Sequence, residues 1–269
     1  RTDVGSRELQ VGNMTDFCFG RSASRAFATL TLISTTLLFA SASSALDFDF
    51  EQFAHGEIVL GTVDGVTIGA DNFNRTFDYA VAFDSTQTGT SDLDLEAGSG
   101  PWSGGNLAGT QLGTMMILQE NNTGCDTGTC SDPDDERGRP AGVISLDFSI
   151  ALLDFGFDAV DIESLAAENA IITFFDGQTS QSVDLLDFFD DTSQYYDSTL
   201  ELGNNTANRF SPITADSLGL DQIDRIEFQL GGSGALDNLV GTPVPEPSTA
   251  LLIGLGLGAL ATQRRRNAS

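Results

Sequence analysis

Apolar and polar positions alternate in short runs through the middle of the chain. The clearest run covers residues 142–150, where Ile144, Leu146, Phe148 and Ile150 alternate with Val or polar neighbours. A period of two places these four side chains on one face of a strand and fixes that face as the core side. Similar short runs predict further strands at 63–69, 79–83, 115–119, 156–162, 170–175, 182–186 and 223–230.

Clusters of Gly, Asn, Asp and Ser separate these runs, as turns do between strands. The middle of the sequence keeps no helical period over three turns, although residues 161–169 could form one short helical turn. Many short strands with turn-rich connections are typical of an antiparallel β-sandwich, here expected to be jelly-roll-like. We therefore predict one all-β domain over residues 46–242.

The first 45 residues have the pattern of a targeting segment. Met14 is followed by Arg21 and Arg25, by an apolar run over 26–40, and by small residues before position 46. A positive start, a short apolar run and small residues at a cleavage site define a secretory signal peptide. We expect residues 1–45 to comprise upstream residues and this signal peptide. A membrane anchor is the alternative, disfavoured because the run is short and ends in small residues rather than charge.

The end of the chain, residues 243–269, consists of an extended peptide, an apolar stretch and a basic cluster. The first and last parts are Pro245, Glu246 and Pro247, and Arg264, Arg265 and Arg266. The prolines keep the peptide out of a helix. As a helix, residues 248–262 would span roughly 22 Å, less than a hydrocarbon core of ~30 Å, and the arginines would stay cytoplasmic.

This tail resembles the PEP-CTERM sorting signal of Gram-negative bacteria over residues 244–266. The resemblance implies export through the inner membrane, contact of the tail with the membrane, and processing by an exosortase-type enzyme at the cell envelope. It further implies delivery to the cell surface or to an exopolysaccharide matrix. An ordinary tail anchor is the alternative.

The chain is strongly acidic, with 39 Asp and Glu against 12 Arg in 269 residues and a net charge of −27. So few cations exclude nucleic acid as a partner, because phosphate neutralisation needs Lys and Arg. The single histidine, His55, excludes histidine-rich zinc sites. An acidic surface attracts divalent cations and keeps a protein soluble in salt. Adaptation to brine explains the same charge and does not exclude a calcium site.

Cys125 and Cys130 are the two cysteines outside the signal segment. In an exported protein, two cysteines so close in sequence favour a disulfide that closes a short loop. A redox or metal pair is the alternative, which lacks a partner histidine or a second cysteine pair.

Two runs of carboxylates supply candidate calcium ligands. Calcium takes about six to eight oxygens from carboxylates, carbonyls and amides, which loops rich in Asp and Asn offer. The candidates are Asp92 and Asp94 in the first run, and Asp132, Asp134 and Asp135 in the second. The second run is not an EF-hand loop, since Arg137 stands where a glycine is needed. A solvated acidic loop is the alternative for each run.

A further pair of candidate ligands lies at the two ends of the domain. Glu51 stands near its start, and Asp237 belongs to the segment 234–240 near its end. Because the terminal strands of a sandwich often pair, Glu51, and with it Asp49, would lie near Asp237. This layout resembles the structural calcium site of jelly-roll carbohydrate-binding modules, which implies calcium at Glu51 and Asp237. A surface glutamate and an Asp-Asn turn are the alternative.

The acidic segments also resemble β-sandwich ectodomains that precede PEP-CTERM tails. The segments that carry this resemblance are 83–85, 92–95, 117–121, 133–135 and 161–163. The resemblance implies a fold and a location, and no biochemical activity.

The single tryptophan, Trp102, lies in a loop rich in Gly and Ser. It could stack on a sugar ring or cap the core. A glycan-active enzyme is the alternative function, because two carboxylates suffice for glycoside hydrolysis, and Asp161 with Glu163 or Asp92 with Asp94 could form the pair. We predict a non-catalytic, exported surface or matrix protein that calcium stabilises, with carbohydrate as a candidate ligand.

Overall fold

The computed structural model describes residues 44–96, 102–162 and 170–245. The expected signal peptide, the apolar tail with its arginines, and nearly all of the expected helical turn at 161–169 lie outside these residues. Within the described ranges, no helix has the length and apolar character needed to cross a membrane.

The regular elements of the described residues are strands and short 3-10 helices, with no α-helix among them. The strands are β1 (Leu46–Phe48), β2 (Gly61–Val63), β3 (Val66–Asn72), β4 (Ala80–Asp84), β5 (Thr114–Leu118), β6 (Gly142–Val160), β7 (Ile171–Asp176), β8 (Thr179–Asp184), β9 (Ala207–Thr214), β10 (Ile223–Leu230) and β11 (Ala235–Pro243). The 3-10 helices are η1 (Cys125–Thr127), η2 (Leu185–Phe188) and η3 (Asp216–Leu218). The predicted all-β class is confirmed.

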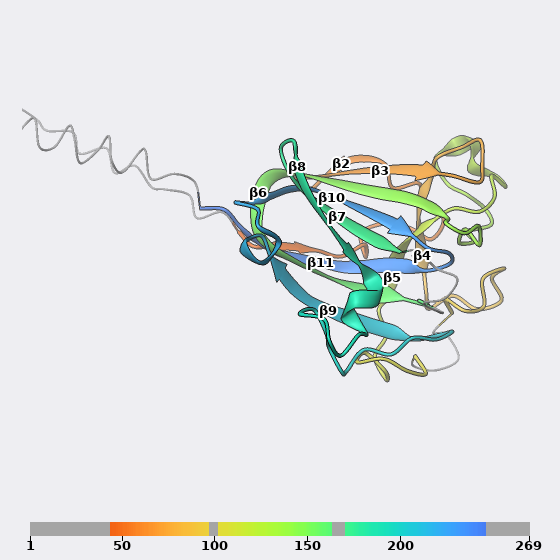
Figure 1. The fold of residues 1–269 in the computed structure, drawn as a ribbon. Helices are drawn as coiled ribbons and strands as arrows, with labels where there is room; N and C mark the ends of the chain where they lie inside the picture. The colour runs from red at the N-terminus through yellow and green to blue at the C-terminus, as the bar shows by residue number, and fades with distance from the viewer. Residues whose placement is uncertain (1–43, 97–101, 163–169, 246–269) are drawn as a thin grey trace, which may run out of the picture. The chain divides into compact units, whose positions relative to one another are not determined.

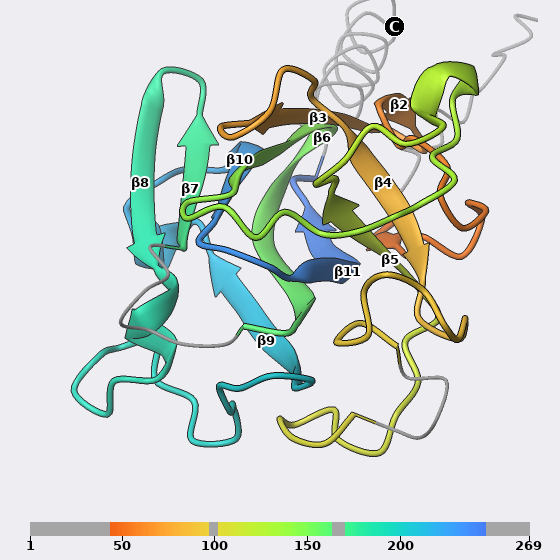
Figure 2. The same ribbon diagram turned by 90° about the vertical axis from the view of Figure 1, so that its right-hand side faces the viewer.

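All strand pairs are antiparallel, and the strand order is β4-β5-β11-β6-β10-β7-β8, with β3 and β9 also paired to β6 (Figure 1). The strands fold over a shared core as a β-sandwich. The β7–β8 hairpin lies on one side of this domain, and β4 with β5 lies on the opposite side (Figure 2).

β6 links the two halves of the sandwich. Its first half pairs with β3 and β10, and its second half pairs with β11 and β9. The sequence predicts two strands here, at 142–150 and 156–162. That division is wrong, because residues 151–155 stay extended while the strand exchanges one pair of neighbours for the other. The apolar alternation changes phase at this point, which is what a pattern-based prediction detects as a boundary.

Phenylalanine fills the larger of two hydrophobic cores. Phe157 stacks on Phe210 with ring centroids 4.7 Å apart and meets Phe228 edge-on at 4.8 Å. Such ring pairs add roughly 0.5–1.5 kcal/mol each beyond the area that they bury. The sequence predicts this role for phenylalanine.

A second, smaller core lies on the other face of β4, β5 and β11. Along β5, Met116 and Leu118 enter the first core, whereas Met115 and Ile117 enter the second. The connecting segments between β4 and β5 and between β5 and β6 supply further members of this core, Trp102 among them. A strand of the sheet is therefore buried on both faces, and polar residues on the second face are buried with it.

Candidate functional site

The two ends of the domain lie side by side. β1 pairs with β11, with Phe48 opposite Leu239 and Leu46 opposite Gly241. The predicted pairing of the terminal segments is confirmed. Asp49 and Glu51 follow β1 directly and lie close enough to Asp237 on β11 for their charges to act on it. Glu51 is held in place by its Oε1 atom, which accepts a hydrogen bond of 2.8 Å from the Thr114 amide.

Three charged side chains form a row across β11, β6 and β9. Asp237 is opposite Asp158, and Asp158 is opposite Arg209. The Arg209 guanidinium donates two hydrogen bonds of 2.8 Å to the Asp158 carboxylate, which is the strong bidentate arrangement. Asp158 and Asp237 are both buried, because the row lies on the face that carries the second core.

The partners of Asp237 are weaker than those of Asp158. Its carboxylate accepts hydrogen bonds from the backbone and side-chain amides of Asn238, at 2.7 and 3.0 Å. Asn238 adopts a positive φ of 47° at a bulge, where the β11–β6 ladder shifts register. Burial, followed by the charges of Asp158, Glu51 and Asp49, raises the pKa of Asp237 to about 8. Asp237 is therefore protonated over much of the neutral pH range.

The two acidic runs of the sequence converge, although about 40 residues separate them. Asp92 accepts hydrogen bonds from the backbone amides of Asp135, at 3.2 Å, and Leu95, at 3.3 Å. Asp135 in turn accepts one of 2.5 Å from the amide of Gly234, the residue before β11. Burial raises the pKa of Asp92, and burial together with the Asp92 charge raises the pKa of Asp135 well above its ordinary value. The carboxyl groups of Asp92 and Asp135 therefore connect the two acidic loops to each other and to the residue before β11.

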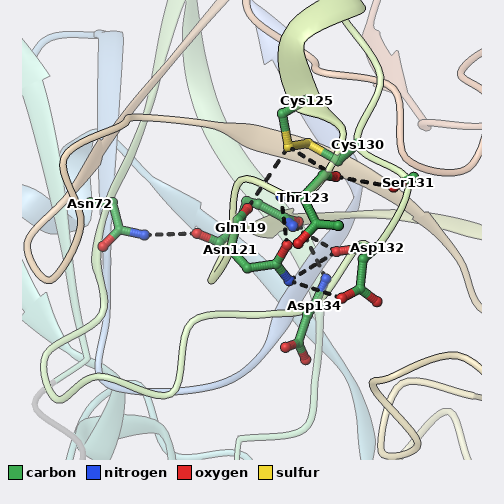
Figure 3. The surroundings of a disulfide bond; sticks show 9 residues. All are labelled: Asn72, Gln119, Asn121, Thr123, Cys125, Cys130, Ser131, Asp132 and Asp134. Atoms are coloured by element: carbon green, nitrogen blue, oxygen red, sulfur yellow. Dashed lines mark hydrogen bonds between the residues drawn. A yellow bond between two sulfur atoms is a disulfide. The ribbon is translucent and has the colours of Figure 1, made fainter.

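Asp132 and Asp134 lie beside the disulfide that links Cys125 to Cys130 (Figure 3). The Gln119 side chain donates to the Asp132 carbonyl at 2.8 Å and accepts from the Asp134 amide at 3.3 Å. Burial, with the charges of Glu120, Asp92 and Asp132, raises the pKa of Asp134 to about 6. The disulfide that the sequence predicts is present. The hydrogen bonds of Gln119, which follows β5, hold the acidic loop in place.

The predicted calcium ligands thus divide into two groups. Asp92, Asp132, Asp134 and Asp135 form the loop group, beside which the Asp94 carbonyl accepts a long bond of 3.5 Å from Asn205. Glu51 and Asp237 form the group at the terminal strands. Within 44–96, 102–162 and 170–245, no set of three His, Cys, Asp or Glu side chains is arranged to hold a metal ion. Backbone amides donate to carboxylates in both groups: to both oxygens of Asp92 and one of Asp135 in the loop group, and to one oxygen each of Glu51 and Asp237 at the terminal strands.

Trp102 and the proposed catalytic pairs are placed differently from the sequence expectation. Trp102 is 2% exposed and belongs to the second core, so burial supports its core role and leaves no ring face for a sugar. Residues 92–96 form a turn rather than a strand, so Asp92 and Asp94 are not neighbouring positions on one strand face. Glu163, the partner considered for Asp161, lies outside the described residues.

A cavity of about 540 Å³ opens between the segment that follows η2 and the far end of β9. Phe188, Leu200 and Ile213 are its buried apolar members. Tyr195 and Tyr196, two of the three tyrosines of the chain, also line it. The remaining lining residues are Gln194, Asp197, Ser198, Ser211, Pro212, Thr214 and Ser217. A second cavity, of about 300 Å³, lies between β1, the 148–152 part of β6 and Pro243.

Sequence reasoning did not select Asp158, Arg209 or the two cavity tyrosines. Asp158 follows Phe157 in an alternating run, and such a polar position normally faces solvent. Asp158 lies on the face of the sheet that the second core covers, and the connecting segments that complete this core are not predicted by any periodicity. The adjacent pair Tyr195-Tyr196 in a chain with three tyrosines was the one available signal for the cavity.

Comparison with known proteins identifies the tail. The family model for the PEP-CTERM protein-sorting motif matches residues 243–266. The chain carries this motif, and the match begins at Pro243, the last residue of β11. The motif implies processing by an exosortase-type enzyme and export to the cell envelope or surface.

The other comparisons add no functional argument. No curated protein matches the chain. Among solved structures, the chain is similar to the enzymatically active domain of tailspike protein 4 of Bacteriophage CBA120, with 10% identity and a TM-score of 0.29. The match covers 72% of this chain and 21% of the tailspike chain, so this chain spans about a fifth of that protein. A TM-score this low supports no inference about activity.

Proposed function

We propose that this chain is an exported protein of a Gram-negative cell surface or exopolysaccharide matrix. An exosortase-type enzyme removes or transfers its tail, and the β-sandwich then acts as a non-catalytic module that binds carbohydrate. The observation that carries this proposal is the position of the sorting motif. It begins at Pro243, where the last strand of the sandwich ends, so the folded domain is closed by the β1–β11 pair before the tail starts.

Calcium is the proposed stabilising ion, with Glu51 and Asp237 as its ligands. The support is electrostatic: burial and three neighbouring carboxylates disfavour the charged form of Asp237, and a bound cation would favour it. Carboxylates alone would not complete this site, since calcium also takes carbonyl and amide oxygens. The loop group is left out of this part of the proposal, because both carboxylate oxygens of Asp92 accept backbone amides, whereas Glu51 accepts one through Oε1 alone.

Processing of the tail is tested in a host with and without its exosortase. The chain is expressed with an internal tag, and the mass and the membrane or surface fraction of the product are measured. We expect the tail to be lost, and the product to leave the inner membrane, only when the exosortase is present. Combined replacement of Pro245, Glu246 and Pro247 by Ala abolishes this step, whereas Asp191→Ala at an exposed site of the domain does not.

Two results would contradict the proposed route. Loss of the tail in the exosortase-deficient host would show that another protease removes it. Unchanged processing of the triple variant would show that the motif is not what the enzyme recognises.

A further inference from the structure

The cavity beside β9 has an apolar base that connects to the main core. Phe188 packs edge-on against Phe210 at 5.0 Å, and the Tyr195 ring lies 5.8 Å from Phe188. A continuous series of aromatic contacts therefore runs from the centre of the sandwich to the cavity wall. Because the inner members are buried, the outer ring is held by packing.

The segment that carries the tyrosines is also fixed by its own polar groups. Asp197 accepts hydrogen bonds from the amide of Thr199, at 2.9 Å, and from its hydroxyl, at 2.6 Å. The Asp197 amide donates to the Phe188 carbonyl at 3.0 Å. The Ser193 hydroxyl accepts from the Tyr195 amide at 3.1 Å. The wall is therefore ordered before any ligand arrives, which lowers the entropic cost of binding.

Several polar atoms in this cavity have no partner inside the described part of the chain. No hydrogen bond there engages the side chains of Gln194, Ser198 or Ser211. The phenolic oxygens of Tyr195 and Tyr196 are likewise uncommitted, and Tyr196 is 43% exposed. An exposed aromatic ring beside free hydroxyl and amide groups offers one apolar face and many donors and acceptors.

The charge of the residues that line the cavity restricts which ligands it can bind. Asp197 is the one charged residue among the described residues that line it, and no arginine does so. The chain as a whole carries −27. An anionic ligand such as a uronate or a phosphate would meet repulsion without a compensating cation. A neutral ligand meets no such penalty.

We propose that this cavity binds a neutral saccharide. Its volume of about 540 Å³ lies within the range of about 300–1,000 Å³ that holds small ligands. The tyrosine rings present flat apolar faces to the C–H face of a sugar, and the free hydroxyl and amide groups meet its hydroxyls. This inference rests on the carbohydrate-binding part of the proposed function and assigns that part to Tyr195 and Tyr196, away from Trp102 and from the carboxylate groups.

The test uses the exported chain with its tail, purified in a detergent without a sugar headgroup. Calorimetry and saturation-transfer NMR measure binding of short neutral oligosaccharides of glucose, mannose, galactose and N-acetylglucosamine, with oligogalacturonate as the anionic comparator. We expect at least one neutral series to bind and the anionic one not to bind. Tyr196→Ala should weaken binding about tenfold or more, because aromatic contacts dominate such sites.

Two variants separate ring stacking from general damage. Tyr196→Phe keeps the ring and should retain affinity within about threefold. Phe73→Ala removes an exposed ring, 48% accessible, that lies outside the cavity, and should change nothing. The inference is overturned if no neutral series binds, if oligogalacturonate binds equally well, or if Tyr196→Ala behaves like Phe73→Ala. A chain that is sorted correctly but fails these tests would overturn the saccharide site alone.

Discussion

Asp158 on β6 and Asp237 on β11 are opposite each other, and the two carboxylates have different hydrogen-bond partners. Asp158 receives the forked guanidinium of Arg209. Asp237 receives only the amides of Asn238, which are neutral donors. Burial therefore raises the pKa of Asp237 to about 8. Asp158, in contrast, has the Arg209 guanidinium as its counter-charge.

The raised pKa of Asp237 predicts a specific dependence of stability on pH. Between its ordinary value of 3.8 and the folded value of about 8, the folded chain binds more protons than the unfolded chain. The free energy of unfolding therefore falls as pH rises through this window. In EDTA, Asp237→Asn removes the titrating group and should stabilise the chain by on the order of 1–3 kcal/mol at pH 8, with little effect at pH 4. Urea unfolding at both pH values measures this.

A matched control removes the same charge elsewhere. Asp191→Asn acts at an exposed position and should leave the difference between the two pH values unchanged. If Asp237→Asn destabilised the chain equally at pH 4 and pH 8, its carboxylate would be a structural acceptor in the ionised form.

Much of the strand pattern could be predicted from the sequence, because some strands alternate with one buried face, as β10 does, and others are short apolar runs buried on both faces, as β4 and β5 are. The run 223–230 coincides with β10, and 79–83 and 115–119 differ from β4 and β5 by one residue. β9 was missed, since Pro212 and the polar residues of its outer face interrupt the alternation. β1 was missed because three residues are too short for a period to show.

The site was less predictable than the strands. The meeting of β1 with β11 follows from a general property of sandwiches, and it brings Glu51 near Asp237 as expected. The convergence of Asp92 with Asp135 depends on two loops whose conformations no local pattern determines. The tyrosine cavity depends in the same way on how the segment after η2 folds back over β9.

The cross-strand pair of β6 and β9 gives a prediction for this part of the sheet. Arg209→Met removes the counter-charge of a buried carboxylate, and the loss should be about 3 kcal/mol in the free energy of unfolding. Asp158→Asn in the same chain should recover most of that loss, because no buried charge is then left unpaired. Urea denaturation of wild type, both single variants and the double variant completes the cycle. Independent, additive losses would show that the pair makes no joint contribution.

The acidity of the whole chain has two possible physical meanings that one experiment can separate. Self-repulsion from a net charge of −27 destabilises the compact state, and any salt relieves it by screening. A calcium site relieves only the repulsion among its own ligands. It does so only for an ion that prefers oxygen ligands in a flexible geometry. Magnesium carries the same charge but demands a tighter octahedral shell, so it reproduces screening without reproducing ligation.

Thermal melts of the full chain should therefore rise more in calcium than in magnesium at equal ionic strength. A ligand at a hundredfold excess over its Kd stabilises the folded state by about 2.7 kcal/mol, which corresponds to about 5–10 °C in a domain of this size. EDTA should reverse the shift. Glu51→Gln and Asp237→Asn should each abolish the difference between calcium and magnesium, whereas Asp92→Asn in the loop group should not. Equal shifts in the two salts would assign the acidity to solvation in brine and remove calcium from the proposal.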